Sequence, residues 1–388
     1  MASVRRKIAV VTSSRADYAH VRWLLHELSA DPKIELEVLA LGPHLSPVFG
    51  NTGRNIRSGW KRDFRIEQVE CLLDSDTDVG MAKTIGVATL GFADALGRLR
   101  PDMVVLIADR YEMLAPAAAA LALRIPIAHI EGGEITAGAI DDTVRNALTK
   151  MSHLHFACTK NAAKRIADMG EEPWRITFSG SLSLDALRRE PLLSRAKLEK
   201  RLGFEVLPDS LVCIYHPVTM LPNPTEEAEE VFAALAGLGR QITLIYPNAD
   251  AGGRQLVERA IDFAKEQEQA RVLVNLDHLV YLSLLKHSGV LIGNSSSGII
   301  ESTSLALPAI NVGIRQRGRE HAKNVIDVPA QAGAIEGAVK LALSPKFGRS
   351  LRDLENPYGQ GNAARIISRV LARSPLGAKL LFKHAHLL

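Results

Sequence analysis

The feature that most constrains the fold is an alternation of short apolar runs with longer amphipathic segments along almost the whole chain. Continuous apolar runs such as Ile8–Val11 and Met103–Ala108 predict strands buried on both faces of a parallel sheet. The segments between them predict helices that cover those faces, so we expect an α/β fold with two Rossmann-like, doubly wound domains facing a cleft. The expected strands are 7–12, 35–41, 103–108, 125–130, 155–158, 211–215, 242–246, 271–274, 290–292, 309–312 and 325–328.

The chain length predicts two domains. A chain of 388 residues is longer than one hydrophobic core ordinarily organises. A charged stretch between Ser183 and Leu207 interrupts the alternating pattern and predicts the boundary. The expected parts are a first domain over 1–182, a second over 183–359, a helix over 360–375 that packs back on the first domain, and a tail over 376–388 without an assigned role.

Composition and missing motifs exclude several functions. Lys and Arg number 47 against 43 Asp and Glu, the net charge is only +4, and no long basic run occurs, so nucleic acid is not an expected partner. The longest apolar region contains prolines and an arginine, so no membrane span is expected. A short first apolar stretch and three widely spaced cysteines favour a cytoplasmic protein. The motifs of zinc hydrolases, nicotinamide enzymes and NTPases are missing, so neither a metal nor a cofactor is expected.

A serine-rich turn in the second half predicts an anion site. Residues Gly293–Glu301 read GNSSSGIIE, and the apolar-periodic segment Ile299–Leu307 predicts a helix. The first backbone N–H groups of a helix lack intrahelical partners, and the helix dipole favours an anion there. One serine would suffice as an ordinary helix cap, but three serines between glycines exceed that need. The expected phosphate-binding residues are Asn294, Ser295, Ser296 and Ser297.

Polar residues follow nearly every expected strand. In doubly wound folds the ligand binds at the carboxyl ends of the strands, so these residues are candidates for one site. A purely structural sheet would more often end in Gly, Asn or Pro turns. The segments concerned are Ser13–Tyr18, Asp109–Glu112, Glu131–Glu134, His216–Pro217, Pro247–Asp250, Asn294–Ser297 and Gly313–Arg319.

The first half contributes carboxylates suited to acid–base chemistry. Clustered carboxylates shift one another's pKa, so that one can hold a proton while another stays ionised. For Asp141 and Asp142, a simpler explanation is favourable charge at a helix N-terminus, with Asp141 paired to Arg145 one turn later. This explanation is weaker for Asp109 and Glu131, because an isolated carboxylate at the end of a buried strand is costly. The candidate acids and bases are Asp109, Glu131, Glu134, Asp141 and Asp142.

The second half contributes groups suited to a nucleotide. Arg315 or Arg317 can clamp a phosphate with two donors, and Glu301 can hold a pair of ribose hydroxyls. The spacing of Arg315, Arg317 and Arg319 would alternate between faces in a strand, so not all three can contact one ligand. His216 is either a phosphate donor or acid, or a capping residue before the following proline.

These segments, in this order, resemble the UDP-N-acetylglucosamine 2-epimerase family, and within it the hydrolysing branch that feeds sialic and legionaminic acid synthesis. The resemblance rests on Ser14–Tyr18 (SRADY), Asp109–Glu112 (DRYE), His129–Glu134 (HIEGGE), His216–Pro217, Asn248–Asp250 (NAD), Gly293–Gly298 (GNSSSG) and Arg315–Arg319 (RQRGR). It covers residues 7–372 and implies a glycosyltransferase-B type of fold in which the second domain holds most of the UDP.

The resemblance also implies a reaction. A carboxylate removes the proton at C2 of a UDP-linked 2-acetamido sugar, and UDP leaves C1 by elimination to give a 2-acetamidoglycal. Water then adds with inverted configuration at C2, which releases the free manno-configured sugar. By resemblance, the catalytic acids are Asp109, Glu131 and Asp141 or Asp142, and the nucleotide contacts are Arg15, Arg110, His216, Asn248, Ser296, Ser297, Glu301 and Arg315. Asp17, in the first of these motifs, is a further candidate contact.

Several alternatives stay open at the level of sequence. The substrate is UDP-N-acetylglucosamine, UDP-2,4-diacetamido-2,4,6-trideoxyglucose or a GDP-linked sugar, and Ala19 and Arg317 depart from some relatives in ways that bear on this choice. The base and the acid are not assigned to particular carboxylates. Competing functions are a non-hydrolysing epimerase, a glycosyltransferase of the same fold and a non-catalytic sensor, although a sensor would not need the acids. The resemblance suggests a homodimer or homotetramer, with the apolar segments 79–99 and 114–123 serving either as an interface or as ordinary core.

Overall fold

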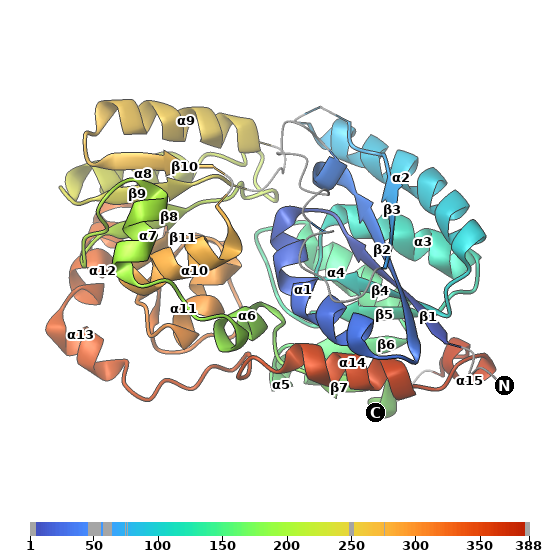
Figure 1. The fold of residues 1–388 in the computed structure, drawn as a ribbon. Helices are drawn as coiled ribbons and strands as arrows, with labels where there is room; N and C mark the ends of the chain where they lie inside the picture. Colours follow the sequence, from blue (N-terminus) through green and yellow to red (C-terminus); the bar gives the residue numbers. More distant parts are fainter. Residues whose placement is uncertain are drawn as a thin grey trace. The chain divides into compact units, whose positions relative to one another are not determined.

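The computed structural model describes residues 5–45, 56, 64–73, 75, 77–247, 252–274 and 276–384 (Figure 1). The chain forms two compact units: unit 1 comprises residues 1–134, 141–186 and 358–388, and unit 2 comprises residues 135–140 and 187–357. The crossing between Ala186 and Leu187 falls inside the 183–207 stretch that the sequence predicts as a boundary. The sequence does not predict that the short segment 135–140 belongs to unit 2.

Unit 1 is built on a seven-stranded parallel sheet with the order β3-β2-β1-β4-β5-β6-β7. Because β1 has β2 on one side and β4 on the other, the direction of winding reverses there, as in a doubly wound fold. The strands are β1 (Arg6–Thr12), β2 (Ile34–Leu41), β3 (Arg65–Val69), β4 (Met103–Ile107), β5 (Ile127–Ile130), β6 (Leu154–Ala157) and β7 (Ile176–Phe178). The helices are α1 (Arg15–Ala30), α2 (Asp78–Leu99), α3 (Leu114–Ala122), α4 (Asp141–Met151), α5 (Lys160–Asp168), α14 (Ala363–Arg373) and α15 (Ala378–Leu381), while α6 (Ser183–Arg189) leads out of the unit.

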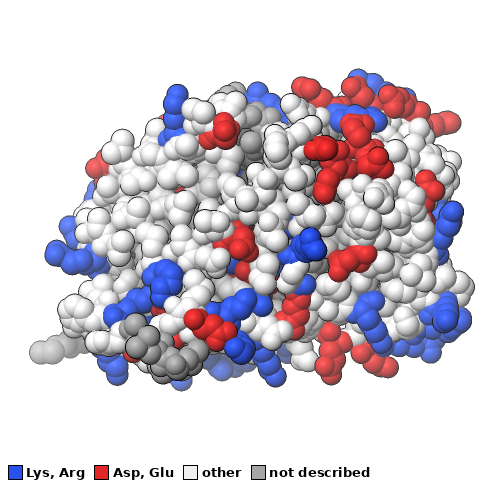
Figure 2. All heavy atoms as spheres, turned by 180° about the vertical axis from the view of Figure 1, so that it is seen from behind, with Lys and Arg blue, Asp and Glu red and all other residues white. Residues whose placement is uncertain are grey.

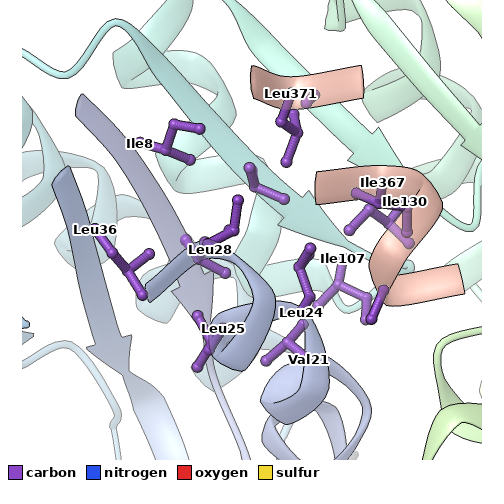
Figure 3. Packing of buried hydrophobic residues seen from close by; sticks show 14 of the residues in the cluster. Ile8, Val21, Leu24, Leu25, Leu28, Leu36, Ile107, Ile130, Ile367 and Leu371 are labelled. Carbon is purple, nitrogen blue, oxygen red and sulfur yellow. The ribbon is translucent and has the colours of Figure 1, made fainter. Parts of the chain in front are cut away.

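The core of unit 1 joins the beginning of the chain to its last long helix. Leu24 and Leu28 lie one turn apart on α1 and are fully buried. Ile367 and Leu371 repeat this spacing on α14 and join the same cluster as Ile8 of β1 (Figure 3). Each buried Leu or Ile side chain stabilises the fold by about 1.5–3 kcal/mol. The apolar face of α14 therefore fastens this helix to unit 1.

Unit 2 is built on a six-stranded parallel sheet with the order β10-β9-β8-β11-β12-β13. Leu211 and Cys213 face a cluster that contains α8, α9 and α12, whereas Val212 and Ile214 face a cluster with α7 and α10. This alternation with period two covers the sheet on both faces. The strands are β8 (Leu211–Ile214), β9 (Ile242–Ile245), β10 (Ala270–Leu273), β11 (Val290–Gly293), β12 (Ala309–Val312) and β13 (Val325–Val328). The helices are α7 (Arg195–Leu202), α8 (Ala228–Gly237), α9 (Gly253–Glu266), α10 (His278–His287), α11 (Glu301–Ser304), α12 (Ala332–Ala342) and α13 (Pro345–Ser350).

Helices α8 and α9 present acidic residues to solvent. Glu229, Glu230, Glu258, Asp262 and Glu266 are exposed. Figure 2 shows acidic side chains gathered over this part of unit 2, at the upper right of the view. Basic residues of α9 pair with three of these acids, since Arg259 contacts Glu229 and Glu266, and Lys265 contacts Asp262 at 2.8 Å.

The predicted strands agree with the observed ones to within two residues at each end, but β3 and β7 are missing from the prediction. Both lie at the edges of the unit 1 sheet. β3 reads RIEQV and has one fully buried residue, and β7 spans three residues, none of them buried. Edge strands are short and tolerate polar residues, so they lack the apolar run that marks a central strand.

Helix α2 is long and apolar. Among the described residues, only this helix has the length and composition of a membrane span, and 33% of an apolar 18-residue stretch of it is buried in the fold. α2 packs against α3 and β3, as a helix that covers a sheet does. Val79, Val87 and Leu90 remain exposed on α2. These residues are where the predicted subunit contact would be tested first.

Candidate active site

The turn after β1 is shaped by the carboxylate of Asp17. Asp17 accepts hydrogen bonds from the backbone N–H groups of Ser13 and Ser14, each at 2.7 Å, and from both hydroxyls at 3.0 Å. The Ser14 hydroxyl accepts in return from the Asp17 N–H, which completes a capping box at the start of α1. Asp17 thus holds the turn, and the predicted contact Arg15 follows as the first residue of α1.

Strands β4 and β5 end in strained backbone. Ala108, which precedes Asp109, has φ of 59°, and Glu131 has φ of 69°. A residue other than glycine in this region costs of order 1–3 kcal/mol, and such strain clusters at functional sites. The two residues follow neighbouring strands, since the Ala108 N–H donates to the Ile130 carbonyl at 2.9 Å. The structure therefore brings together the ends of the two strands that carry the predicted acids Asp109 and Glu131.

Arg145 of α4 gathers the acidic residues of unit 1. Its side chain is 1% exposed and forms ion pairs with Asp109 and, at 3.4 Å, with Asp142. Its Nη1 also donates to the Glu134 carbonyl at 3.0 Å. The alternative explanation from sequence paired Arg145 with an acid at the start of its own helix, and the structure shows such a pair with Asp142, together with a pair to the distant Asp109. A buried guanidinium is costly without anionic partners, so the cluster depends on these carboxylates.

Glu131 and Glu134 have different surroundings although they are three residues apart. Glu131 is partly exposed, and its carboxylate accepts from the Ser181 hydroxyl at 3.1 Å. Glu134 is 4% exposed and accepts from the Tyr358 hydroxyl at 2.9 Å and the Thr159 hydroxyl at 3.4 Å. Glu134 therefore joins three segments of unit 1, which is a structural role for a predicted catalytic acid. Glu131 keeps the exposure that a reacting group needs.

Arg110, a predicted nucleotide contact, is bound by a neighbouring acid. Its Nε and Nη2 donate to the two carboxylate oxygens of Glu112 at 3.2 and 3.0 Å, and Glu112 is fully buried. A bidentate pair of this kind fixes the plane of the guanidinium. A ligand would have to bond those N–H groups of Arg110 that do not donate to Glu112.

Asn294 joins three strand ends of unit 2. Its Oδ1 accepts from the His216 N–H at 2.7 Å, and its Nδ2 donates to the His216 carbonyl at 2.8 Å. Its own carbonyl accepts from Arg315 Nη1 at 3.2 Å and from Gln316 Nε2 at 3.0 Å. The amide of Asn294 is thus engaged by the protein, and its place in the site is to position His216 and the serine turn. Sequence reasoning missed Gln316, which is 2% exposed.

The hydroxyl groups of the three serines of the turn have different surroundings. The Ser295 hydroxyl accepts from the Ser297 N–H at 3.4 Å, and the Ser297 hydroxyl accepts from the Tyr281 hydroxyl at 2.5 Å. No described residue bonds the hydroxyl of Ser296, which is partly exposed. A Cβ at Gly293, where φ is 134°, would lie 1.9 Å from the Ile214 carbonyl oxygen, so only glycine fits between β11 and the turn. Ser296 is the serine best placed to donate to a ligand.

The helix predicted over Ile299–Leu307 is wrong in length. The structure has a 3₁₀ turn at Ser296–Gly298 and a four-residue helix, α11, at Glu301–Ser304. The Ser302 hydroxyl donates to the Gly298 carbonyl and the Thr303 hydroxyl to the Ile299 carbonyl, and such side-chain bonds compete with helix propagation. So short a helix has little dipole, so the expected contribution of a helix dipole to an anion site is weak here.

The arginine-rich segment after β12 is a turn, not a strand. The Arg317 N–H bonds the Ile314 carbonyl at 3.1 Å, and the Arg319 N–H bonds the Gln316 carbonyl at 3.2 Å. The argument from strand alternation therefore does not apply to this segment, although the three arginines do differ in environment. Arg315 is 7% exposed and its Nε has no partner among the described residues, whereas Arg317 is exposed.

Glu301 and Asn248 are two further residues that the sequence predicts to contact the nucleotide. Glu301 is the first residue of α11 and is 3% exposed. The pKa of the Tyr281 hydroxyl is raised mainly by burial, and the negative charge of Glu301 raises it further. Asn248 lies outside the described residues. No group of three His, Cys, Asp or Glu side chains that could hold a metal occurs in the described part of the chain.

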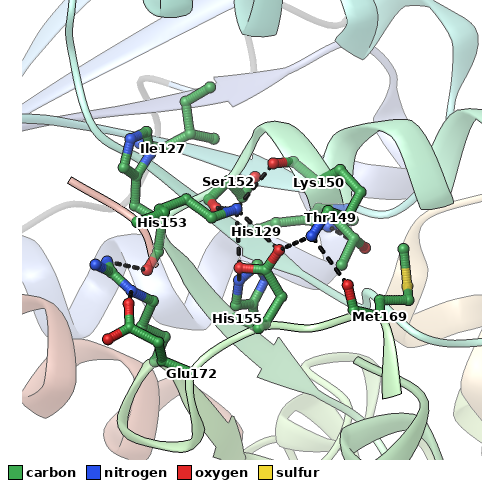
Figure 4. A network of polar contacts seen from close by, with 12 residues as sticks. Ile127, His129, Thr149, Lys150, Ser152, His153, His155, Met169 and Glu172 are labelled. Carbon is green, nitrogen blue, oxygen red and sulfur yellow. Dashed lines mark hydrogen bonds and ion pairs between the residues drawn. The ribbon is translucent and has the colours of Figure 1, made fainter. Parts of the chain in front are cut away.

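Figure 4 shows a buried polar network in unit 1 that includes Lys150, Ser152 and His155. Glu171 accepts from Lys150 at 2.7 Å, from His155 at 3.1 Å and from Lys383 at 2.9 Å. Burial raises the pKa of Glu171, but these hydrogen bonds outweigh it and bring the pKa to about 2. Lys383 also donates to the Ser152 carbonyl at 2.6 Å. The network fixes the segment after α15 against unit 1.

Comparison with known proteins finds relatives along most of the chain. The family profile described as UDP-N-acetylglucosamine 2-epimerase matches residues 26–372. A GDP/UDP-N,N'-diacetylbacillosamine 2-epimerase (hydrolyzing) of Campylobacter jejuni is 38% identical over 328 residues, which are 83% of this chain and 84% of that protein. A UDP-N,N'-diacetylbacillosamine 2-epimerase (hydrolyzing) of Legionella pneumophila is 36% identical over 382 residues, 97% of this chain and 98% of that protein.

A solved structure has the same fold. The UDP-GlcNAc 2-epimerase from Neisseria meningitidis, bound to UDP-GlcNAc, matches with a TM-score of 0.79 at 18% identity over 95% of this chain and 100% of that chain. At this identity the likeness establishes the fold alone. It confirms the expected fold class, two doubly wound parallel sheets of the glycosyltransferase-B type.

Proposed function

Since the chain belongs to the UDP-N-acetylglucosamine 2-epimerase family, we propose that it hydrolyses a UDP-linked 2-acetamido sugar to UDP and the free sugar inverted at C2. The observation that carries the proposal is the acidic cluster around Arg145, where Asp109 and Asp142 share one buried guanidinium. Binding of a nucleotide sugar needs no such cluster, whereas elimination at C2 needs groups that take up and return protons.

The reaction requires one proton acceptor and one proton donor. A carboxylate takes the proton from C2, the C2 electron pair forms the C1–C2 double bond, and the C1–O bond breaks so that UDP leaves with its electron pair. A second group then gives a proton to C2 from the opposite face, and water adds to C1 as a hydroxyl. The remaining proton of the water restores the second group, and the first carboxylate releases its proton to solvent. Asp109 and Glu131 are the proposed pair, because each follows one of two neighbouring strands of unit 1.

Unit 2 is proposed to hold UDP. Arg315 offers a buried guanidinium and Ser296 a hydroxyl, both suited to a diphosphate oxygen. Glu301 is proposed to accept from the ribose hydroxyls. Stabilising the negative charge of departing UDP lowers the barrier to elimination, so these groups assist the reaction as well as binding.

Among UDP-sugars, we propose UDP-2,4-diacetamido-2,4,6-trideoxyglucose as the first substrate. The two relatives from Campylobacter jejuni and Legionella pneumophila are named for N,N'-diacetylbacillosamine, the sugar of this nucleotide, and they cover most of the chain. The product would be the free manno-configured sugar, the precursor of legionaminic acid. UDP-N-acetylglucosamine, which would give N-acetylmannosamine for sialic acid synthesis, is the second candidate. A GDP-linked substrate is the third, since one relative's name includes GDP.

Proton NMR in D₂O tests the proposal, with each of the three sugar nucleotides offered separately. The expected result is free manno-configured sugar that carries deuterium at C2, together with free UDP, or with free GDP if the GDP-linked sugar is the substrate. A product that keeps its nucleotide would indicate a non-hydrolysing epimerase, and transfer only to an added acceptor would indicate a glycosyltransferase. Binding of all three without turnover would leave the sensor function and overturn the proposed reaction.

A further inference from the structure

The segment 135–140, which we call the strap, is the only part of the chain before residue 187 that belongs to unit 2. It follows directly on Glu134 and ends directly before Asp141, both of which belong to unit 1. The six residues therefore connect the two stretches of sequence that carry the predicted acids. Nothing in the hydrophobic pattern requires the chain to leave unit 1 here, since the next strand in sequence, β6, pairs with β5.

The strap is held in unit 2 by backbone and side-chain contacts. The Gly138 N–H donates to the Arg315 carbonyl at 3.4 Å, and the Met220 N–H donates to the Gly138 carbonyl at 3.3 Å. The Ile140 N–H donates to the Thr219 hydroxyl at 3.1 Å. Because these partners come from two loops, the strap joins the segment after His216 to the segment after β12.

Gly138 lies against the backbone of Arg315. A Cβ at position 138 would lie 2.6 Å from the Arg315 Cα and 2.8 Å from its N, distances that a real side chain does not adopt. The backbone of Gly138 is not in the left-handed region, so its conformation suits any residue. The requirement for glycine therefore comes from the close approach to Arg315 alone.

Gly318, three residues after Arg315 in the same turn, makes a second close approach to the strap. At Gly318, where φ is 88°, a Cβ would lie 3.0 Å from the Ile135 side chain. Arg319 Nη2 donates to the Thr136 hydroxyl at 3.4 Å, and Thr136 is 3% exposed. The strap thus follows the arginine turn from Arg315 to Arg319 along its length.

We propose that the strap positions Arg315 for the nucleotide and that Gly138 is the positioning residue. The guanidinium of Arg315 reaches Asn294 through Nη1, and its direction depends on a backbone that the strap supports. Displacing that backbone moves the guanidinium relative to the serine turn. The inference rests on the proposed function, because it takes Arg315 to be the diphosphate clamp.

A double-mutant cycle on UDP affinity tests the proposal by isothermal titration calorimetry. Gly138→Ala is expected to weaken UDP binding about tenfold, and Arg315→Ala by a similar or larger factor. In the Arg315→Ala background, Gly138→Ala should have almost no further effect, because a residue that acts through Arg315 has nothing left to position. Independent effects that multiply in the double variant would overturn the positioning role.

Matched controls separate positioning from folding. Gly337→Ala on α12 of the same unit adds a methyl group where no atom lies within 4 Å, and it should leave UDP affinity unchanged. Thr219→Val removes the acceptor for the Ile140 N–H without adding bulk to the strap, and it should weaken UDP about two- to fivefold. If Gly138→Ala does not fold, Thr219→Val carries the same cycle with Arg315→Ala, and unaltered UDP affinity in Thr219→Val would then overturn the proposal.

The same measurements keep the two proposals apart. If Arg315→Ala weakens UDP but Gly138→Ala and Thr219→Val do not, the strap has no positioning role and the proposed function stands. If Arg315→Ala itself leaves UDP affinity unchanged, the clamp is wrong and the inference fails with it. In the turnover assay, strap variants should raise KM and also lower kcat, because Arg315 is proposed both to bind UDP and to stabilise its departing charge, whereas loss of a catalytic acid should lower kcat and leave UDP affinity unchanged.

Discussion

The side-chain amide of Asn294 bonds both backbone groups of His216, accepting from its N–H at 2.7 Å and donating to its carbonyl at 2.8 Å. An asparagine side chain here continues the pairing of β8 with β11 beyond the last paired residues of the two strands. The arrangement explains why an asparagine follows Gly293, although the sequence alone makes it look like a ligand. It also ties the serine turn to the end of a neighbouring strand.

We expect Asn294→Asp to destabilise unit 2 and to weaken UDP binding. The substitution keeps the acceptor for the His216 N–H but places a second carboxylate oxygen against the His216 carbonyl in a buried position. Loss of a buried hydrogen bond with an unsatisfied partner costs about 1–3 kcal/mol. Urea unfolding and UDP titration measure the two effects. Asn223→Asp is the control, because Asn223 is exposed and its Oδ1 accepts from the Thr225 N–H; an equal loss in both variants would contradict the role of Asn294.

Asp109→Asn and Glu131→Gln should each keep UDP affinity and lose turnover. Removing a general acid or base typically lowers kcat by about 10²–10⁴-fold. The measurement is the rate of UDP release, together with a UDP titration of each variant. Asp168→Asn, on the exposed face of α5 where it pairs with Lys164, should leave both unchanged. Normal turnover in both site variants would remove the proposed pair.

Arg145→Lys should lower kcat at least tenfold and reduce the free energy of unfolding by about 1–3 kcal/mol. A lysine keeps the charge, but a single ammonium group cannot contact Asp109, Asp142 and the Glu134 carbonyl in the way that the guanidinium does. Steady-state kinetics and urea unfolding are the measurements. Arg259→Lys is the control for an arginine that pairs with surface acids. Wild-type kcat in Arg145→Lys would show that Arg145 has no part in the acidic cluster's function.

Stability should fall as the pH decreases from 6.5 towards 4, in part because of His129. Burial is the main cause that lowers the pKa of His129 to about 4, with its hydrogen bond to Ala108 opposing the shift. Between the folded value of about 4 and the unfolded value of about 6.5, the unfolded state binds more protons, so stability rises with pH. One such group contributes up to about 1.4 kcal/mol per pH unit in this window.

Urea unfolding at pH 7.5, 6.0 and 5.0 measures this dependence. His129→Gln keeps a donor for the Ala108 carbonyl and removes the titration, so the dependence should become flatter. His20→Gln on α1 is the control and should keep the wild-type slope. Burial also lowers the pKa of His153 to about 4, so part of the slope will remain in His129→Gln. An unchanged slope in His129→Gln would show that His129 is not a source of the acid sensitivity.

Much of the fold could be predicted because the relevant signal is local. A central strand such as β4 is an unbroken apolar run, and a helix such as α9 has apolar residues at helical spacing, whatever the rest of the chain does. The same holds for the polar segments that follow the strands, since a parallel sheet brings its carboxyl ends to one edge. Edge strands β3 and β7 lack this signal and were missed.

The roles of individual site residues were harder to predict. Asp17, Arg110, Glu134 and Asn294 have the residue types of ligands, yet each has partners within the protein. The sequence gives the residue type of a carboxylate or amide but does not show whether the group binds a substrate or a neighbouring side chain. Arg145 could have been found from its spacing to Asp142, but its pairing with Asp109 joins residues 36 positions apart.

The sequence by itself determined the alternation of strands and helices, the two-domain fold class and the family of reactions, because apolar periodicity and short motifs are properties of neighbouring residues. Tertiary structure alone decided the edge strands, the partners of Arg145 and Asn294, and the passage of the strap through unit 2. These depend on contacts between segments far apart in the chain. Such contacts form only when burial of the hydrophobic cores has brought the segments together, so no local sequence pattern predicts them.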